Sequence, residues 1–164
     1  MTAVTEIASI QRRFCAYLID VAILLIPTLL IRLLLKNFPL ISHLSYMYVD
    51  CSYFTYFISS KAQATPGQQS MNIHTISLDG SKIDLSLAFD RSISQFFLFL
   101  LRNIIAILIE LFQEQNALVN ALIVLGAIIM LLTTYWYLVA CFSKKKQTYH
   151  DMLFNTVVIK GTIK

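Results

Sequence analysis

The stretch RRFCAYLIDVAILLIPTLLIRLLL, residues 12–35, holds two arginines followed by an apolar run that contains one carboxylate, Asp20. About 20 apolar residues, at ~1.5 Å rise per residue, cross the ~30 Å hydrocarbon layer of a bilayer as a helix. Residues 14–35 are therefore predicted to span a membrane. Asp20 would lie ~9 Å inside it, where an ionisable group is costly unless it is paired, protonated or hydrated.

The composition indicates an integral membrane protein over the whole length. Of 164 residues, 57% are hydrophobic and 13% are charged, whereas about 25% charged residues are usual in soluble domains. The net charge of +4 is best explained by membrane orientation, because the basic residues flank the apolar segments. We expect no nucleic-acid partner. No nucleophile, phosphate loop or metal-ligand spacing predicts an enzyme, a cofactor or a metal site.

Three more segments have the length of a span: residues 41–59, 95–112 and 117–142. The first of them is the least apolar, but it is rich in aromatic residues around Asp50, which suits a helix inside a bundle. The predicted fold class is an all-α membrane protein, a four-span transmembrane helical bundle.

The region 61–94, between spans two and three, has a different character. It is polar at first and then alternates apolar and polar residues around Asp79-Gly80. Asp-Gly between alternating runs is typical of a hairpin, because both central turn positions favour positive φ. We expect a small cytoplasmic β-hairpin at the membrane surface, then an interfacial helix from about Ser86. A strand-like TVVIK segment, residues 156–160, lies near the C-terminus.

The distribution of basic residues predicts the orientation. With four spans, ten of the 13 lysines and arginines lie on the face that holds both termini and the middle region, and only Lys36 lies on the other face. Arg32 and Arg102 fall within spans. Cytoplasmic segments carry the excess of lysine and arginine. Both termini are therefore predicted to lie in the cytoplasm.

Depth in the membrane suggests partners for the charges within the spans. Asp20 and Arg102 lie at similar depths from the same side and could pair, whereas Arg13 is a rival on nearly the same face of the first helix. Arg32 and Glu110 match near the opposite side in the same way. If both pairs form, spans one and three are neighbours along their length.

Asp50 has no charge at its own depth. It is therefore the better candidate for a carboxylate that binds a proton or a cation. The alternative, here and at the paired positions, is that these polar residues only hold the helices together. His150 beside Asp151 is interpreted in this second way, as part of a hydrogen-bonded cluster.

Four motifs occur in order: RRFCAYLID (12–20), ATPGQQ (64–69), SLDG (77–80) followed by AFDR (88–91), and QTYHDMLFNTVV (147–158). Together they resemble the RDD family of bacterial multi-pass membrane proteins, and the resemblance implies one RDD-type domain over residues 12–160. Residues 1–11 and 161–164 would be short cytoplasmic tails.

The resemblance assigns roles to residues in each motif. Arg12 or Arg13 would be the family arginine, Asp20 its first aspartate and Asp151 its other acidic residue. The other matching residues are Pro66 and Gly67 of a TPGK-like turn, Asp79 and Gly80, His150, and Arg91 as the arginine after the hairpin. The chain departs from the family pattern at Gln68, where a lysine is usual, and at Asn72 and His74.

The resemblance also implies a function, transport of an unidentified ion or small ligand across the bacterial inner membrane. Asp20 and Asp50 would bind or relay a cation or proton, with Arg13 or Arg91 holding Asp20 ionised. A homo-oligomer is expected, or assembly with other membrane proteins, because four helices enclose little pathway. The alternative is a non-transporting scaffold that docks partners through its basic cytoplasmic face.

Overall fold

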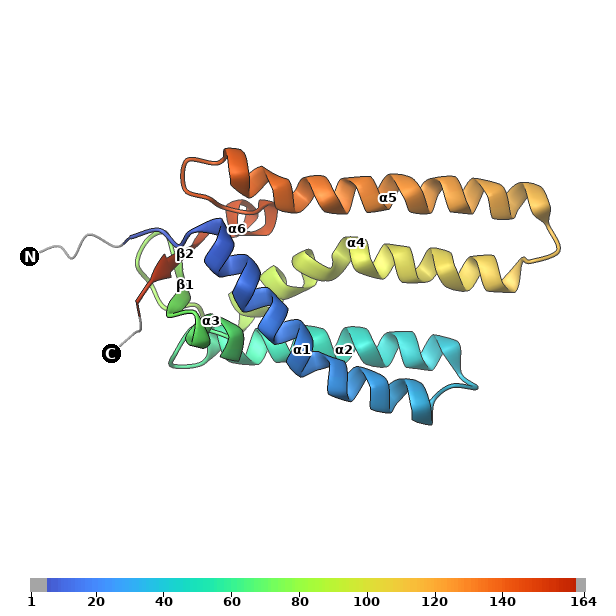
Figure 1. The fold of residues 1–164 in the computed structure, drawn as a ribbon, viewed down its shortest axis with the longest axis horizontal. Helices are drawn as coiled ribbons and strands as arrows, with labels where there is room; N and C mark the ends of the chain where they lie inside the picture. Colours follow the sequence, from blue (N-terminus) through green and yellow to red (C-terminus); the bar gives the residue numbers. More distant parts are fainter. Residues whose placement is uncertain (1–5, 162–164) are drawn as a thin grey trace, which may run out of the picture.

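The computed structural model describes residues 6–161, without the side chains of Trp136 and Tyr137. Four long helices form a bundle; three of them follow the longest axis, and the first runs obliquely to it (Figure 1). They are α1 (Ile10–Leu34), α2 (Pro39–Ser59), α4 (Leu85–Leu111) and α5 (Asn116–Phe142). The described chain begins and ends at one end of the bundle, and the α1–α2 and α4–α5 loops lie at the other.

The helices begin where the sequence supplies capping groups. The Ser9 side chain accepts a hydrogen bond from the Arg12 backbone N–H at the start of α1, and Asp84 accepts one from Leu87 N–H at the start of α4. Pro39 occupies the first turn of α2, where no backbone N–H is needed. The predicted interfacial helix and third span form one continuous helix, α4, because no glycine or proline interrupts residues 85–111.

Three of the described helices are long and apolar enough to cross a membrane: α1, α4 and α5. The chain is therefore a mostly helical protein with several membrane-capable helices. α2 has 21 residues, but serines, a threonine, a histidine and Asp50 lower its hydropathy.

The packing order of the long helices differs from the prediction. α4 packs against α2 and α5, and α2 is the long helix against which α1 packs. One buried cluster joins three of these helices. It contains Leu24 of α1, Phe54 and Ile58 of α2, and Ala88 of α4. The prediction that spans one and three are neighbours along their length is wrong, because α2 lies between them.

A two-stranded antiparallel sheet joins distant parts of the chain. β1 (Ile73–Ser77) pairs with β2 (Thr156–Lys160), so that Ile73 faces Lys160 and Ser77 faces Thr156. The TVVIK strand is thus confirmed, whereas the hairpin around Asp79-Gly80 is wrong. Gly80 does adopt a positive φ of 79° in a turn. Residues 81–84, after this turn, do not form the second strand of a hairpin. Their Ile83 is instead fully buried in the cluster between the helices.

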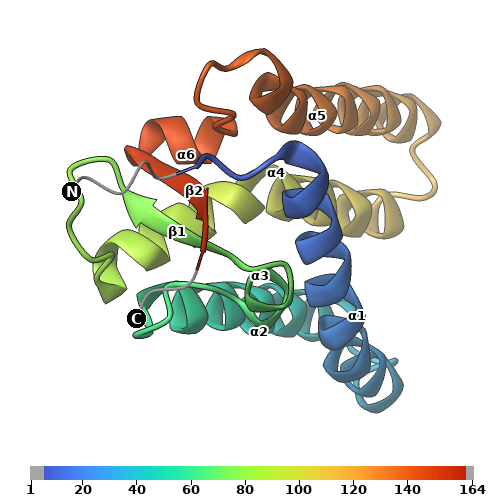
Figure 2. The same ribbon diagram turned by 60° about the vertical axis from the view of Figure 1, so that its left-hand side comes forward.

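Two short helices complete this end of the molecule: α3 (Pro66–Ser70) and α6 (Tyr149–Leu153). We call α3, β1, α6 and β2 together the sheet layer; Figure 2 shows it lying across one end of the bundle. Residues 6–9 run along β2, since Ile7 bridges Ile159 and Ala8 N–H donates to Val158 C=O. Of the rest of the predicted tails, residues 10 and 11 belong to α1, Gly161 N–H donates to the Asn72 carbonyl, and 1–5 and 162–164 lie outside the described residues.

Candidate functional site: two buried aspartates and a cavity

Asp20 lies where α1 meets the sheet layer, and its side chain is almost fully buried. One carboxylate oxygen, Oδ1, accepts hydrogen bonds from Gly67 N–H at 2.8 Å and from Tyr53 O–H at 2.8 Å. The other, Oδ2, accepts one from Thr65 O–H at 2.6 Å. Three donors from α2 and from the start of α3 therefore replace the water that this carboxylate would lose on burial.

The contact between α1 and α3 requires a glycine. A Cβ atom placed on Gly67 would lie 2.1 Å from the Ala16 carbonyl oxygen and 2.8 Å from the Asp20 carboxylate. No side chain at position 67 can occupy that space without moving the two helices apart. The Asp20 carboxylate also caps the N-terminus of α3, where Gly67 N–H has no carbonyl acceptor within the helix.

Asp151 is the second buried aspartate, and it holds two arginines. Its Oδ1 accepts a 2.6 Å hydrogen bond from Arg91 Nη2, and its Oδ2 accepts one of 3.1 Å from Arg13 Nη1. Thr148 donates to Oδ2 from its hydroxyl and its backbone N–H, at 2.8 and 3.2 Å, and Thr156 O–H lies 3.3 Å from Oδ1. This cluster joins α1 and α4 to α6 and β2.

The surroundings of Asp151 determine the protonation of the cluster. Burial alone would raise the pKa of Asp151, but Arg91, His150 and Arg13 together hold it below its usual range. For the neighbouring His150, burial dominates over the attraction of Asp151 and lowers its pKa to about 3. At neutral pH the cluster therefore contains two guanidinium cations, one carboxylate and a neutral imidazole.

The prediction that an arginine pairs with Asp20 is wrong. Arg13 and Arg91 both bind Asp151, and no arginine of the described chain lies within 4.0 Å of the Asp20 carboxylate. Asp20 lies on the α2–α3 side of α1, whereas the first turn of α1 directs Arg13 toward β2, where Arg13 Nη2 also donates to the Val158 carbonyl. Arg12 donates to the Met71 carbonyl instead.

The predicted pair between Arg32 and Glu110 is also wrong. Arg32 is exposed in the last turn of α1, and Glu110 is exposed near the end of α4. These two helix ends are not neighbours, because α2 separates α1 from α4. Within residues 6–161, neither side chain forms an ion pair.

Asp50 and Arg102, the other two predicted site residues, make no contact with the Asp20 or Asp151 carboxylate. Asp50 is half-buried on α2 and has no hydrogen bond or ion pair within the described chain. Arg102 is exposed on α4, with its guanidinium carbon 4.9 Å from the centre of the Phe99 ring. Within residues 6–161, no group of three or more His, Cys, Asp or Glu side chains is placed to hold a metal ion.

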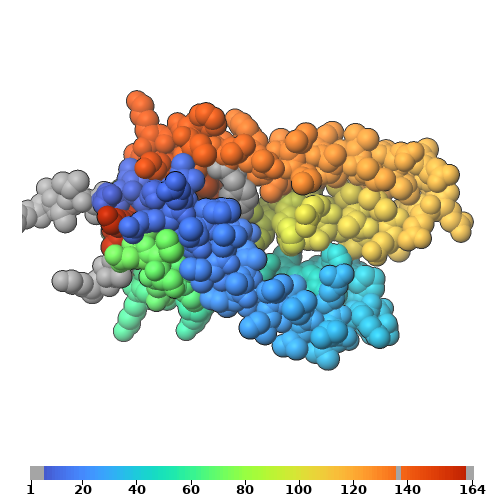
Figure 3. Space-filling view, in the orientation of Figure 1, coloured from blue at the N-terminus to red at the C-terminus, as the bar shows by residue number. Residues whose placement is uncertain are grey.

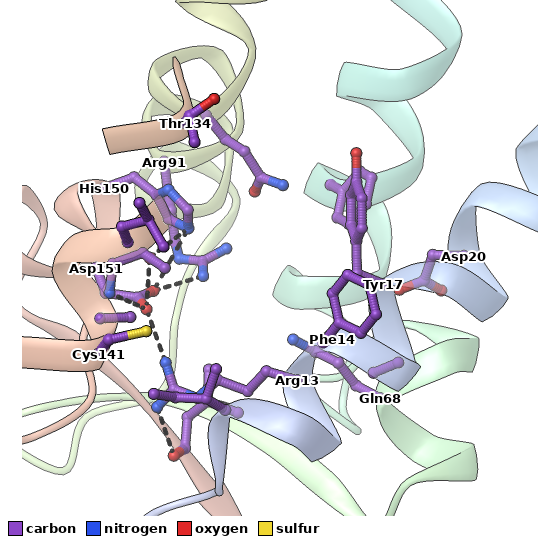
Figure 4. Close-up of a pocket in the computed structure, with 18 residues that line it drawn as sticks. Arg13, Phe14, Tyr17, Asp20, Gln68, Arg91, Thr134, Cys141, His150 and Asp151 are labelled. Atoms are coloured by element: carbon purple, nitrogen blue, oxygen red, sulfur yellow. Dashed lines mark hydrogen bonds and ion pairs between the residues drawn. The ribbon is translucent and has the colours of Figure 1, made fainter. Parts of the chain in front are cut away.

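A cavity of about 480 Å³ lies between the long helices and the sheet layer. Figure 4 shows Asp20 and Tyr17 on the wall formed by α1, with Arg91, His150 and Asp151 on the opposite wall. Apolar side chains such as Phe14 and Leu138 supply most of the remaining lining. In the space-filling view, α1 and α5 diverge with distance from the sheet layer, and the surface between them is hollowed (Figure 3).

The sequence contained a signal for the sheet layer that the hairpin interpretation missed. Thr65 is followed three residues later by Gln68, and Thr148 by Asp151. This spacing is typical of a capping box, in which the threonine and the third residue cap each other's backbone N–H groups. Both boxes are present in the structure, at the starts of α3 and α6. Gln68, which replaces the usual family lysine, is therefore a capping residue here.

One of three comparisons with known proteins found a match. No match was found among curated proteins or among solved structures. The family model described as "RDD family" matches residues 7–155, from the segment beside β2 through α6. This range contains Asp20, Gly67, Arg91 and Asp151, the residues that join the helices to the sheet layer. The chain is a helical membrane protein that belongs to the RDD family.

Proposed function

We propose that the chain spans the bacterial inner membrane four times, with α2 as the span that hydropathy alone does not identify. Its 21 residues measure ~31 Å as a helix, about the thickness of the hydrocarbon layer. α2 packs between α1 and α4 and buries Ser42 and Thr55, so these two polar residues need not face lipid. The sheet layer, which lies on the lysine-rich side, is placed in the cytoplasm.

Reporter fusions test this topology. A periplasm-active reporter should be active after Asn37 and after Gln115, and silent after Gly80. Silence after Gln115 would contradict the orientation. Activity after Gly80 would remove α2 from the set of spans.

We infer that the protein takes part in moving a small ion or ligand across the membrane. The observation that carries this inference is the 480 Å³ cavity at the junction of the spans and the sheet layer. A cavity of this size is typical of small-ligand sites. Its charged walls lie at the cytoplasmic entrance of the proposed bundle, where an ion or polar ligand would first leave water.

Asp50 is the carboxylate that we assign to ion or proton binding. The oxygens of Asp20 and Asp151 already accept hydrogen bonds from protein donors. Asp50 has no such partner in the described chain, and it lies one helical turn before Tyr53, whose hydroxyl contacts Asp20. A carboxylate within a span that lacks a partner marks an ion or proton pathway more often than a structural contact.

Flux measurements on liposomes test this assignment. Purified protein in vesicles loaded with a pH-sensitive dye should show proton flux driven by a cation gradient, and Asp50→Asn should abolish it. Asp90→Asn is the matched control, because it removes the same charge from an exposed position near the start of α4. Normal flux in Asp50→Asn would exclude Asp50 as the ion- or proton-binding carboxylate.

The second candidate is a scaffold without transport activity. The saturated contacts of Asp20 and Asp151 favour it, because both aspartates act to hold the sheet layer in place. Absence of flux under every cation gradient, together with pull-down of partners by the intact protein but not by a variant lacking the exposed charges of Lys144 and Lys145, would favour this candidate. Neither candidate assigns catalysis to the chain.

Self-association belongs to the transport proposal, since four helices enclose little pathway on their own. α1 and α5 leave an open edge between them. The mass of the purified protein in detergent, with the detergent contribution subtracted, should correspond to two or more chains. A single chain that still supports flux would remove the need for an oligomer.

A further inference from the structure

Arg102 is a cation on a membrane helix without a protein anion beside it. It lies within the predicted span of α4 and is exposed, and no carboxylate of the described residues lies within 4.0 Å of it. The contact that the structure gives its guanidinium is the face of the Phe99 ring. A charged side chain is costly in the membrane unless it has a partner. Its partner is therefore expected to come from outside the chain.

The direction of the Arg102 side chain places its charge near the membrane surface. Helical side chains tilt toward the helix N-terminus, and Phe99 lies about one turn nearer the sheet layer. If the span begins at Gln95, the guanidinium lies ~6 Å inside the membrane boundary, counting ~1.5 Å per residue to Phe99. At this depth the headgroups of the adjacent lipid leaflet are the nearest anions outside the protein, and long basic side chains near the ends of a span extend toward them.

Arg102 lines a second cavity, of about 260 Å³. It lies between α4 and α5, and its lining combines the arginine with mostly apolar or small side chains: Leu98, Phe99, Arg102, Met130, Thr133 and Thr134. Thr134 also lines the larger cavity, so the two cavities adjoin. A charged group at one level with apolar walls beside it suits an amphiphile.

The charges of the two cavities favour an anion over a cation. The carboxylates of the larger cavity, Asp20 and Asp151, are occupied by protein donors, so a cation would have to displace those donors. Arg102 has no hydrogen bond or ion pair within the described chain, and Gln95 has none either. The N–H donors of Arg102 and Gln95 therefore outnumber the side-chain acceptors in the two cavities that have no protein donor.

We propose that the groove between α4 and α5 binds one anionic phospholipid of the cytoplasmic leaflet. Its phosphate lies against Arg102, and one acyl chain lies along Met130 and Leu98. The lipid, rather than a free anion, is the occupant because the site lies on helices whose outward faces are apolar and exposed, as on α5 at Met130 and Leu131. This inference goes beyond the proposed transport and does not depend on it.

Lipid titration of the purified, delipidated protein tests the proposal. Native mass spectrometry would compare phosphatidylglycerol with phosphatidylcholine of identical acyl chains. The wild type should retain one phosphatidylglycerol with at least about tenfold preference. Both lipids offer a phosphate to Arg102, but the choline cation of phosphatidylcholine repels the guanidinium in a poorly hydrated site, whereas the glycerol headgroup carries no positive charge. Arg102→Gln should remove the preference.

Arg32→Gln is the matched control, since it removes the same charge from an exposed position within another span. It should leave the preference unchanged. Met130→Trp, which fills the apolar part of the groove without altering charge, should weaken the binding of both lipids. Because Arg102 is exposed, neutralising it should not alter folding, which the thermal midpoint of each variant checks.

Three results would overturn the proposal. Undiminished preference for phosphatidylglycerol in Arg102→Gln would exclude Arg102 as its ligand, and equal loss in Arg32→Gln would show general charge attraction only. Displacement of the lipid by millimolar inorganic phosphate would indicate a small-anion site. Each readout is lipid binding, so a failure of transport leaves these outcomes unaffected.

Discussion

The backbone N–H of Gly67 donates a 2.8 Å hydrogen bond to the carboxylate of Asp20, and the same glycine has no room for a side chain against the carbonyl of Ala16. A residue inside the first membrane helix is thereby joined to the first turn of α3. The Asp20 carboxylate, which looked like an isolated charge in an apolar run, is an acceptor for the sheet layer.

Substitution of Gly67 by alanine should destabilise the protein. The added Cβ would overlap the Ala16 carbonyl and separate Gly67 N–H from Asp20, which together should cost about 2–4 kcal/mol. Gly126→Ala is the control, because its nearest neighbour would be the Ile105 side chain at 3.8 Å. Unfolding in detergent should show a large loss for the first variant and none for the second. Equal stabilities would contradict the close contact.

Tyr53→Phe should remove one of the three donors to Asp20 and nothing else. The expected loss is about 1 kcal/mol, typical of a single net hydrogen bond. Tyr56→Phe, one turn away on the same helix with its side chain 68% exposed, should have no effect on stability. If the two variants unfold alike, the hydrogen bond between α2 and α1 makes no contribution.

Asp151→Asn should be more destabilising than either change at Asp20's partners. It leaves the buried guanidinium of Arg91 and that of Arg13 without their counter-charge, a situation that typically costs about 3–5 kcal/mol. Glu6→Gln is the control, because its ion pair with Lys160 is exposed. A small loss for Asp151→Asn, similar to that of the control, would show that the cluster is not a stabilising contact.

Stability should fall on acidification because of His150. Its pKa is lowered from 6.5 to about 3 by burial, so the unfolded chain binds the proton more readily than the folded one. The contribution is complete above pH 6.5 and is lost as the pH falls toward 3, with uptake of about one proton on unfolding. The lowered pKa of Asp151 acts in the same direction at still lower pH.

Unfolding curves from pH 7 to pH 4 measure this dependence. His150→Gln keeps a polar side chain of similar size without a titrating group, and its stability should vary less over that range. An identical pH dependence in the wild type and in His150→Gln would assign the effect to other groups.

The long helices could be predicted from sequence because their signal is local. Each of the apolar runs at 14–35, 95–112 and 117–142 coincides with one helix of the structure to within one residue at its C-terminal end, and a bilayer requires little more than length and hydropathy. The helix expected from about Ser86 is the first part of α4, where Ala88 and Ser92 are buried.

The pairings could not be predicted because they depend on contacts between distant segments. β1 has a local turn after it, yet its partner is β2, near the C-terminus. Likewise, equal depth suggested Arg102 as the partner of Asp20, although depth says nothing about which helix face a side chain occupies. The true donors, Thr65 and Gly67, come from a loop whose path the apolar pattern does not determine.

Hydrogen–deuterium exchange of Asp20→Asn tests most directly whether this carboxylate holds the sheet layer on the membrane helices. The asparagine amide replaces one acceptor by a donor, so we expect exchange at residues 64–77, including the Gly67 amide, to become at least ~10-fold faster, as loss of more than about 1.4 kcal/mol of local stability implies. Asp50→Asn, which removes the same charge from α2, should leave that exchange unchanged. Equal protection of residues 64–77 in Asp20→Asn and the wild type would contradict the account.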